Sequence, residues 1–169
     1  MSDKSINVGI IGQCFVGSAI REGLKNFHNI RTYDLNAKKC NSTHEEVCVN
    51  SDIIFICLPT PMRKDGSCDT RILEFAISDI DDVCEEVVKD KSRPVLVIKS
   101  TIPPGTTERI SSMYKDRDNG RTDIPICFSP EFLTEANSFD DFKNQNRIII
   151  GYDGSPKKSA AKKVKHMFS

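Results

Sequence analysis

The first glycine-containing stretch has the residue types and spacing of a turn that holds a pyrophosphate. Gly12 and Gly17 follow the apolar run 6–11 and precede the helix-like segment 18–27. In a Gly-x-Gly-x-x-Gly turn the first glycine allows the bend, and the third lets the helix pack closely on the strand. The second glycine lets backbone N–H groups approach the phosphates. Cys14 occupies that middle position, so the chain changes the residue closest to the phosphates.

The same stretch is open to two alternatives. Two glycines after an apolar run are common in proteins and need not bind a nucleotide. Gly12 and Gly17-Ser18 also match part of the Gly-x-x-x-x-Gly-Lys-Ser/Thr loop of mononucleotide-binding proteins. The lysine that this loop needs after its second glycine is absent, which disfavours a mononucleotide loop.

An aspartate stands at the end of the next apolar run. Asp34 closes the run 30–34 and follows Gly12 by 22 residues. A carboxylate at this spacing is placed to accept hydrogen bonds from the hydroxyls of an adenosine ribose. Because it would repel a 2′-phosphate, it favours NAD over NADP. The structural alternative is an aspartate that caps a turn or a helix before Asn36.

Two later loops present hydroxyl groups after apolar runs. Thr60 lies between Pro59 and Pro61, and the loop is stiff because proline restricts the backbone and lacks an N–H donor. Ser100 and Thr101 end another run, where a hydroxyl can orient a water, a carboxamide or a substrate hydroxyl. A rigid structural loop and ordinary helix capping are the alternatives for these two loops.

The last of these loops places two carboxylates four residues apart, at Glu131 and Glu135. If the segment is helical, both project from the same face. Paired carboxylates suit proton transfer or the positioning of a water molecule. A pair of solvated surface glutamates is the structural alternative.

Short apolar runs alternate with helix-like segments, which predicts an α/β fold: a Rossmann-type, doubly wound, mostly parallel sheet of six strands. Most runs are rich in Ile and Val without period-two alternation, which is typical of strands covered on both faces. The expected strands are 6–11, 30–34, 52–58, 94–100, 124–129 and 147–152, with helices over 18–27, 70–88 and 103–113 and a lysine-rich helix at the end. Ligands of such sheets bind beyond the carboxyl ends of the strands, where these loops fall.

Composition argues against several classes of protein. The 24 basic and 24 acidic residues leave no net charge, so nothing favours nucleic acid or a membrane surface. No apolar run approaches the ~20 residues of a membrane span, and the first residues lack the apolar core of a signal peptide. Seven cysteines without a Cys-x-x-Cys pair argue against a zinc site and a disulfide scaffold. We expect residues 1–169 to form a single dinucleotide-binding domain in the cytoplasm, with no metal.

Taken in order, these loops resemble the N-terminal NAD-binding domain of the UDP-glucose/GDP-mannose dehydrogenase family. The resemblance runs from about residue 6 to residue 152. It is carried by residues 11–17 (Ile-Gly-Gln-Cys-Phe-Val-Gly), 58–61 (Leu-Pro-Thr-Pro, with Asp65, Gly66 and Asp69 after it), 99–107 (Lys-Ser-Thr-Ile-Pro-Pro-Gly-Thr-Thr) and 130–135 (Pro-Glu-Phe-Leu-Thr-Glu, with Arg147 beyond). The order of the motifs makes the resemblance specific.

The resemblance implies a function and a site. The family oxidises the 6-hydroxyl of a nucleotide sugar twice, to a uronic acid, and passes two hydrides to NAD. Asp34 and Lys39 would hold the adenosine ribose, and Thr60 and Thr101 would line the region of the nicotinamide and the catalytic water. Glu131 would assist proton transfer, and Glu135 would lie beside the nicotinamide. The implied cofactor contacts are Gly12, Cys14, Phe15, Val16, Gly17, Asp34, Lys39, Pro59, Thr60, Thr101 and Glu135, and the implied catalytic residues are Thr101, Glu131 and Glu135.

Two departures from the family pattern limit this expectation. The Cβ and Sγ of Cys14 would clash with the phosphates or push them outward. The family's nucleophilic thiol lies in a Gly-Gly-Ser-Cys-Phe-Pro-Lys-Asp-type motif that the 169 residues lack, and its central helix and sugar-nucleotide domain have no counterpart. Without that thiol no thiohemiacetal can form. We therefore expect the chain to be incomplete alone, and to act on a UDP-glucose-like nucleotide sugar only with a C-terminal substrate domain.

Two alternatives stay open beside this expectation. One is a stand-alone NAD-binding or regulatory module, and the other is a degenerate domain that retains only the fold. The sequence does not identify the nucleotide sugar, and it leaves open whether the chain forms an oligomer.

Overall fold

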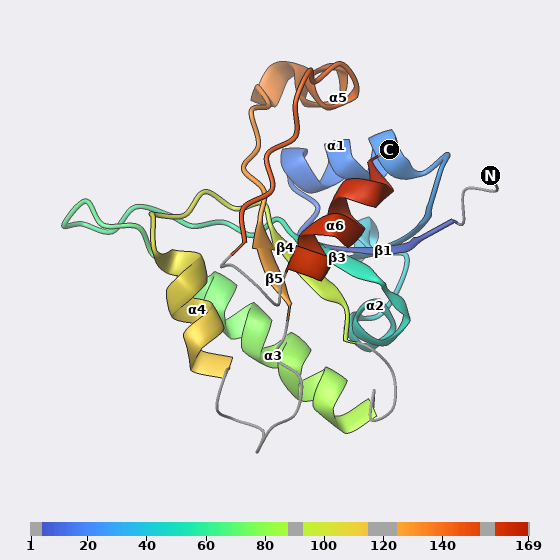
Figure 1. The fold of residues 1–169 in the computed structure, drawn as a ribbon. Coiled ribbons are helices and arrows are strands. Elements are labelled where there is room, and N and C mark those ends of the chain that lie inside the picture. The colour runs from blue at the N-terminus through green and yellow to red at the C-terminus, as the bar shows by residue number, and fades with distance from the viewer. Residues whose placement is uncertain (1–4, 88–92, 115–124, 153–157, 169) are drawn as a thin grey trace.

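Five parallel strands run through the centre of the molecule (Figure 1). The computed structural model describes residues 5–87, 93–114, 125–152 and 158–168. The strands are β1 (Asn7–Ile11), β2 (Asn29–Tyr33), β3 (Ile53–Ile56), β4 (Val95–Ile98) and β5 (Ile126–Phe128). Their order in the sheet is β2-β1-β3-β4-β5, so the chain winds in one direction from β1 to β2 and in the other from β3 to β5. The expected doubly wound parallel sheet is confirmed.

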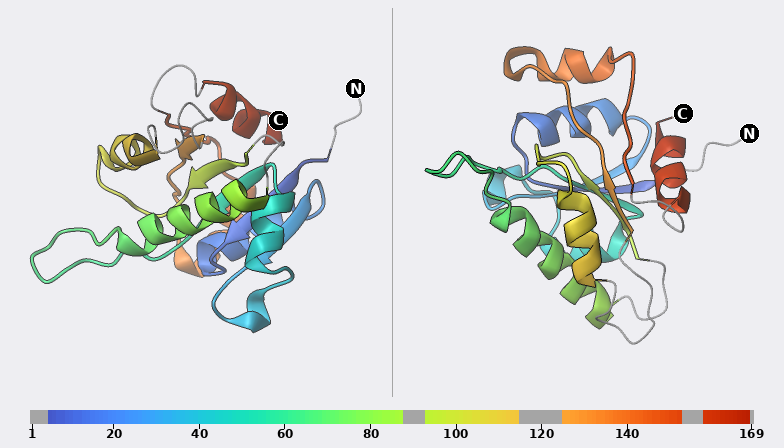
Figure 2. Two further views of the ribbon diagram at one scale, coloured as in Figure 1. Left: turned by 90° about the horizontal axis from the view of Figure 1, so that it is seen from below. Right: turned by 60° about the vertical axis from the view of Figure 1, so that its left-hand side comes forward.

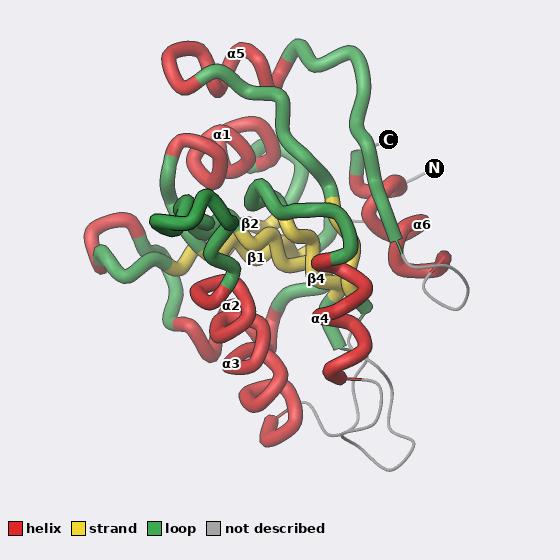
Figure 3. Tube along the Cα trace, turned by 90° about the vertical axis from the view of Figure 1, so that its left-hand side faces the viewer, coloured by secondary structure: helices red, strands yellow, loops and turns green. Residues whose placement is uncertain are grey.

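Helices cover both faces of this sheet (Figures 2 and 3). The α-helices are α1 (Phe15–Leu24), α2 (His44–Asn50), α3 (Arg71–Val87), α4 (Thr106–Tyr114), α5 (Ser138–Lys143) and α6 (Lys158–Met167), with short 3-10 helices η1 (Ala37–Lys39) and η2 (Glu135–Asn137). Helices α1 and α6 pack on one face, and α2, α3 and α4 pack on the other. The described residues include no helix long and apolar enough to cross a membrane.

The two hydrophobic cores explain why the strands read as continuous apolar runs. In β3, Ile53 and Phe55 pack in the core beneath α1 and α6, whereas Ile54 and Ile56 pack in the core above α3. All four are at most 1% exposed. Because successive side chains of a strand point to opposite faces, a strand buried on both faces needs apolar residues at every position.

The expected sixth strand, 147–152, is wrong. Over these residues the chain makes one antiparallel bridge, in which Gly151 and Phe128 exchange backbone hydrogen bonds of 2.7 and 2.8 Å. The neighbouring strand β5 is only three residues long, so it presents an edge too short for an extended ladder. Ile149 is accordingly 43% exposed.

Other boundaries differ by a few residues from the sequence-based expectation. Helix α1 begins at Phe15 rather than at residue 18, because the glycine turn runs directly into it. The helix expected over 70–88 is confirmed as α3, and the lysine-rich helix as α6. Residues 88 and 124 of the expected helix and strand lie outside the described residues. So do Asp153 and Gly154, a pair that is typical of a turn, and Lys157 of the lysine-rich segment.

A close approach of α2 to β1 generates a prediction for Gly9. A Cβ at Gly9 would lie 2.7 Å from Oγ of Ser51 and 2.8 Å from Cγ1 of Val47. We expect Gly9→Ala to lower the free energy of unfolding by about 1–3 kcal/mol, the usual cost of overpacking. Gly151→Ala is the control, since its Cβ would meet Phe128 at an ordinary 3.6 Å, and should cost under about 0.5 kcal/mol. Equal urea denaturation midpoints for the two variants would contradict the packing explanation.

Candidate functional site

A cavity of about 450 Å³ opens where the winding of the sheet reverses, at the carboxyl ends of β1 and β3. This is the place where doubly wound sheets bind ligands, and the volume is within the usual range for small-molecule sites. Its lining residues are Ile11, Gly12, Cys14, Tyr33, Asp34, Leu35, His44, Cys57, Leu58, Pro59, Ile72, Phe75, Ala76 and Asp79.

The outer glycines are both required by the turn itself. Gly12 has a φ of +92°, and a Cβ there would lie 2.4 Å from the carbonyl oxygen of Cys57. A Cβ on Gly17 would lie 2.0 Å from the carbonyl oxygen of Gly12. The turn therefore brings β1, α1 and the end of β3 closer together than any side chain allows.

Cys14 occupies the middle position without backbone strain. It is the N-cap of α1, with φ −72° and ψ −168°, a conformation open to any residue. Its Sγ donates to the carbonyl oxygen of Cys57 at 3.4 Å and lines the cavity. The next two amides, of Phe15 and Val16, are among the first N–H groups of α1, which have no partner within the helix. A helix N-terminus of this kind attracts anions.

Asp34 and Lys39 hold the glycine turn through one residue, Gln13. The Oδ2 atom of Asp34 accepts a hydrogen bond from the Gln13 N–H at 2.7 Å, and Oδ1 accepts from the Asn36 N–H at 2.8 Å. Nζ of Lys39 donates to the Gln13 carbonyl oxygen at 3.1 Å. Asp34 thus has the turn-capping role of the structural alternative and also lines the cavity.

Asp34 is held in its ionised form. Burial raises its pKa, but the two backbone hydrogen bonds and the charge of Lys39 outweigh this, so the pKa lies below the ordinary value. An ionised carboxylate keeps further lone pairs for accepting hydrogen bonds from a ligand.

The loops after β3 and β4 are tied together. Oγ1 of Thr60 donates to the carbonyl oxygen of Thr101 at 2.6 Å. The buried hydroxyl of Ser100 donates to the carbonyl oxygen of Leu58 at 2.6 Å and accepts from the Leu58 N–H at 3.1 Å. The structure therefore places Thr60 and Thr101 side by side, as a shared site requires.

A buried lysine ties the loop after β4 to the loop after β5. Lys99 is 8% exposed, and its Nζ donates to the Pro130 carbonyl oxygen at 3.2 Å and lies 3.5 Å from Oγ of Ser129. Burial lowers the pKa of Lys99, while the nearby Cys57 thiol and Glu131 carboxylate act in the opposite direction. Sequence reasoning assigned Lys99 no individual role, although Lys99 opens the motif 99–107 on which the family resemblance partly rests.

The segment from Glu131 to Glu135 is not helical, so the condition for the two carboxylates to share a helix face is not met. Residues 130–134 are irregular, and Glu135 begins the 3-10 helix η2. Backbone N–H groups of this segment donate to side-chain carboxylates rather than to the carbonyl oxygens of a helix. Oε2 of Glu131 accepts from the Leu133 N–H at 2.5 Å, and Oδ2 of Asp141 accepts from the N–H and the hydroxyl of Thr134 at 2.8 and 2.6 Å. The two glutamates therefore do not share a helix face.

The cavity contains some of the expected cofactor contacts and several residues that were not expected. Gly12, Cys14, Asp34 and Pro59 line it. Phe15, Val16, Gly17, Lys39, Thr60, Thr101, Glu131 and Glu135 do not. The unexpected residues include Tyr33, Leu35, His44, Ile72, Phe75, Ala76 and Asp79. In the sequence, the residues of α3 stood out only by their helical spacing. The same spacing is also typical of a helix face that is buried in the hydrophobic core.

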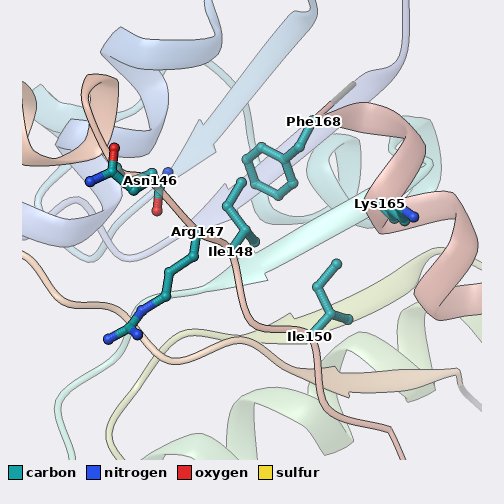
Figure 4. A pocket seen from close by; sticks show the side chains of 7 residues that line it. Asn146, Arg147, Ile148, Ile150, Lys165 and Phe168 are labelled. Carbon is teal, nitrogen blue, oxygen red and sulfur yellow. The ribbon is translucent and has the colours of Figure 1, made fainter.

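A second cavity, of about 510 Å³, lies between residues 145–150 and the end of α6 (Figure 4). It contains none of the expected cofactor contacts. The Arg147 guanidinium lies 5.2 Å from the centre of the Phe132 ring, a cation–π contact that ties the segment to the loop after β5. Among the described residues, no group of three or more His, Cys, Asp or Glu side chains could hold a metal ion.

Comparison with known proteins identifies related sequences. Residues 24–169 match the family described as "UDP-glucose/GDP-mannose dehydrogenase family, NAD binding domain". The chain is 35% identical over 106 residues to the UDP-glucose 6-dehydrogenase of Rhizobium meliloti, covering 62% of this chain and 23% of the relative. It is 33% identical over 142 residues to an uncharacterised protein of Methanocaldococcus jannaschii, covering 84% of this chain and 14% of the relative. The chain thus spans less than a quarter of either relative.

The fold also matches solved structures. A UDP-glucose dehydrogenase of Pyrobaculum islandicum superimposes with a TM-score of 0.84 at 24% identity, covering 99% of this chain and 45% of that one. A GDP-mannose dehydrogenase of Pseudomonas aeruginosa superimposes with a TM-score of 0.80 at 20% identity, covering 95% and 43%. At these identities the superpositions establish the fold.

The hydrogen bonds of Asp34 predict a pH-dependent contribution to stability. Because the native pKa is below the ordinary 3.8, the carboxylate stabilises the fold above that value, and this stabilisation is lost as the pH falls through the native pKa. We expect Asp34→Asn to lower the free energy of unfolding at pH 7, and the difference from wild type to shrink as the pH falls below about 4. Urea denaturation of both proteins at several pH values measures this difference in the free energy of unfolding. Asp82→Asn, at an exposed position of α3, is the control. A difference for Asp34→Asn that does not change with pH would contradict this electrostatic role.

Proposed function

Since the chain belongs to the UDP-glucose/GDP-mannose dehydrogenase family, we propose that residues 1–169 form one dinucleotide-binding domain that holds NAD in the cavity at the ends of β1 and β3. The observation that carries this placement is the ionised Asp34, which joins the glycine turn to the cavity wall. The chain provides the parts that a dinucleotide needs: a turn closed by two obligatory glycines, a helix N-terminus and a carboxylate for a ribose.

In this placement each element takes one part of NAD. The N-terminus of α1, with the amides of Phe15 and Val16, faces the pyrophosphate. Asp34 accepts hydrogen bonds from the adenosine ribose hydroxyls, and Lys39 contributes to the same region by holding the turn. Thr60 and the loops after β4 and β5 would hold the nicotinamide half.

We propose that the domain supplies the cofactor side of an NAD-dependent oxidation of a sugar 6-hydroxyl. When bound, NAD supplies the hydride acceptor. Thr101 is proposed to orient a water or the reacting hydroxyl, because its carbonyl is fixed by Thr60 while its side chain is exposed. Glu131 is proposed to take up a proton, and Glu135 to lie beside the nicotinamide. In the structure both belong to the loop that Lys99 holds at Pro130.

A substrate domain is part of this proposal. The relative from Rhizobium meliloti is named a UDP-glucose 6-dehydrogenase, and the chain covers 23% of it. We propose that a UDP-glucose-like nucleotide sugar becomes a substrate when a C-terminal substrate domain is supplied with this one.

Isothermal titration calorimetry with NAD and NADP tests the placement. We expect wild type to bind NAD at least about tenfold more tightly than NADP, because the Asp34 carboxylate repels a 2′-phosphate. Asp34→Ala should weaken NAD binding by about tenfold, equivalent to about 1.4 kcal/mol. It should also reduce the ratio between the affinities for NAD and NADP. Asp140→Ala, at an exposed position of α5, should change neither value. An unchanged preference in Asp34→Ala would show that this carboxylate does not contact the ribose.

The thiol of Cys14 predicts a specific limit on affinity. Since Sγ lines the cavity next to the N-terminus of α1, we expect Cys14→Gly to tighten NAD binding by about tenfold or more. Cys14→Ala keeps the Cβ but not the sulfur, so it should bind with intermediate affinity. Micromolar NAD binding by wild type that Cys14→Gly does not improve would contradict the steric role. Absence of binding even in Cys14→Gly would favour a domain that retains only the fold.

A further inference from the structure

One end of the cavity is formed by α2 and α3. Helix α3 contributes residues spaced three or four apart, which therefore share one face: Ile72, Phe75, Ala76 and Asp79. Helix α2 contributes its first residue, His44. The Ile72 and Phe75 side chains are exposed despite being large and apolar. Apolar side chains around a few polar groups are typical of a site for an aromatic ring.

His44 and Asp79 are the polar side chains that these two helices give to the cavity, and they contact each other. Nδ1 of His44 lies 3.4 Å from Oδ2 of Asp79. The Tyr33 ring packs edge-on against the imidazole, with 5.0 Å between ring centres, and Sγ of Cys48 lies 3.7 Å from Nε2. These contacts fix the imidazole, which in turn orients the carboxylate.

The Asp79 carboxylate keeps capacity for a ligand. The contact with His44 engages Oδ2 only, so Oδ1 can accept a further hydrogen bond. The Asp79 side chain is 50% exposed and the His44 side chain 19%, so a ligand in the cavity can reach the carboxylate.

The covalent structure of a dinucleotide brings a base to this end. The adenine is bonded to the ribose that Asp34 holds in the placement proposed above. From Asp34 the cavity wall continues through Leu35 to α2 and α3. In that placement the pyrophosphate takes the space at the glycine turn, so the base extends toward α2 and α3.

We propose that Asp79, oriented by His44, accepts a hydrogen bond from the 6-amino group of adenine and makes the cavity selective for that base. This rests on the proposed placement of NAD. A carboxylate has no proton to donate near neutral pH, so it attracts an amino group and repels a carbonyl oxygen. A 6-oxo group in the place of the amino group puts an acceptor against the carboxylate, and the remaining donor of that edge, N1–H, lies one ring position away. Such a mismatch at the amino-group position is the kind that sites reject strongly.

The probe for this selectivity is nicotinamide hypoxanthine dinucleotide, in which a 6-oxo group replaces the 6-amino group of NAD. We expect wild type to bind NAD about tenfold more tightly than this analogue in calorimetry. Asp79→Asn should reduce the ratio to about two or less, because an amide can accept from an amino group or donate to an oxo group by turning over. His44→Phe keeps a ring against Tyr33 but removes the contact with Asp79, so it should reduce the ratio in part.

The matched control is Asp82→Asn, which removes a carboxylate from an exposed position of α3 outside the cavity and should keep the wild-type ratio. Equal affinity of wild type for the two dinucleotides, or an unchanged ratio in Asp79→Asn, would overturn base selection and show that the His44–Asp79 pair only joins α2 to α3. In either case NAD binding itself would still support the proposed function. If neither dinucleotide binds to wild type or to Cys14→Gly, the proposed function fails, and base selection fails with it.

Discussion

The backbone of Gln13 is the point on which the arrangement of the cavity depends. Asp34 accepts its N–H and Lys39 donates to its carbonyl oxygen, so the loop after β2 holds the turn between β1 and α1. The turn cannot relax elsewhere, because Gly12 and Gly17 already lie closer to their neighbours than a Cβ allows. The two residues expected to bind a ribose therefore also shape the turn that would bind the pyrophosphate. In the proposed placement of NAD, cofactor binding and the integrity of the turn would be coupled through the same carboxylate.

The remaining loops at this edge of the sheet are connected in series. Ser100 and Thr60 join the loop after β3 to the loop after β4, and Lys99 joins that loop to the one after β5. The hydroxyl groups of Ser100 and Thr60 are on short side chains, which lose little conformational freedom when they form these contacts, whereas ordering the long side chain of Lys99 costs more. A site held in this way has its geometry before a ligand arrives, which favours binding and catalysis.

A glycine at residue 14 would allow the backbone conformation of the turn and would also leave space for a ligand, whereas Cys14 meets only the first of these requirements. The backbone conformation at residue 14 is open to any amino acid, so the fold does not need a glycine there. The thiol nevertheless lines the cavity beside the amides at the start of α1. The substitution therefore leaves the scaffold intact and concerns only the space for a ligand. This fits a chain that belongs to the dehydrogenase family and whose glycine turn departs from the family pattern at residue 14.

By itself, the sequence determined the elements whose signals are local. Buried strands such as β3 read as apolar runs because both faces are covered, and the glycine turn and Asp34 were found from their spacing. Only the tertiary structure decided what depends on partners far apart in the chain. The expected strand 147–152 does not form, because β5 is too short to pair with it. Glu131 and Glu135 do not share a helix face, because the carboxylates of Glu131 and Asp141 accept the hydrogen bonds of the N–H groups between them. The role of Lys99 and the meeting of His44 with Asp79 depend on how loops and helices pack. Local spacing records backbone conformation and burial, whereas contacts between distant segments exist only once the sheet has brought their ends together.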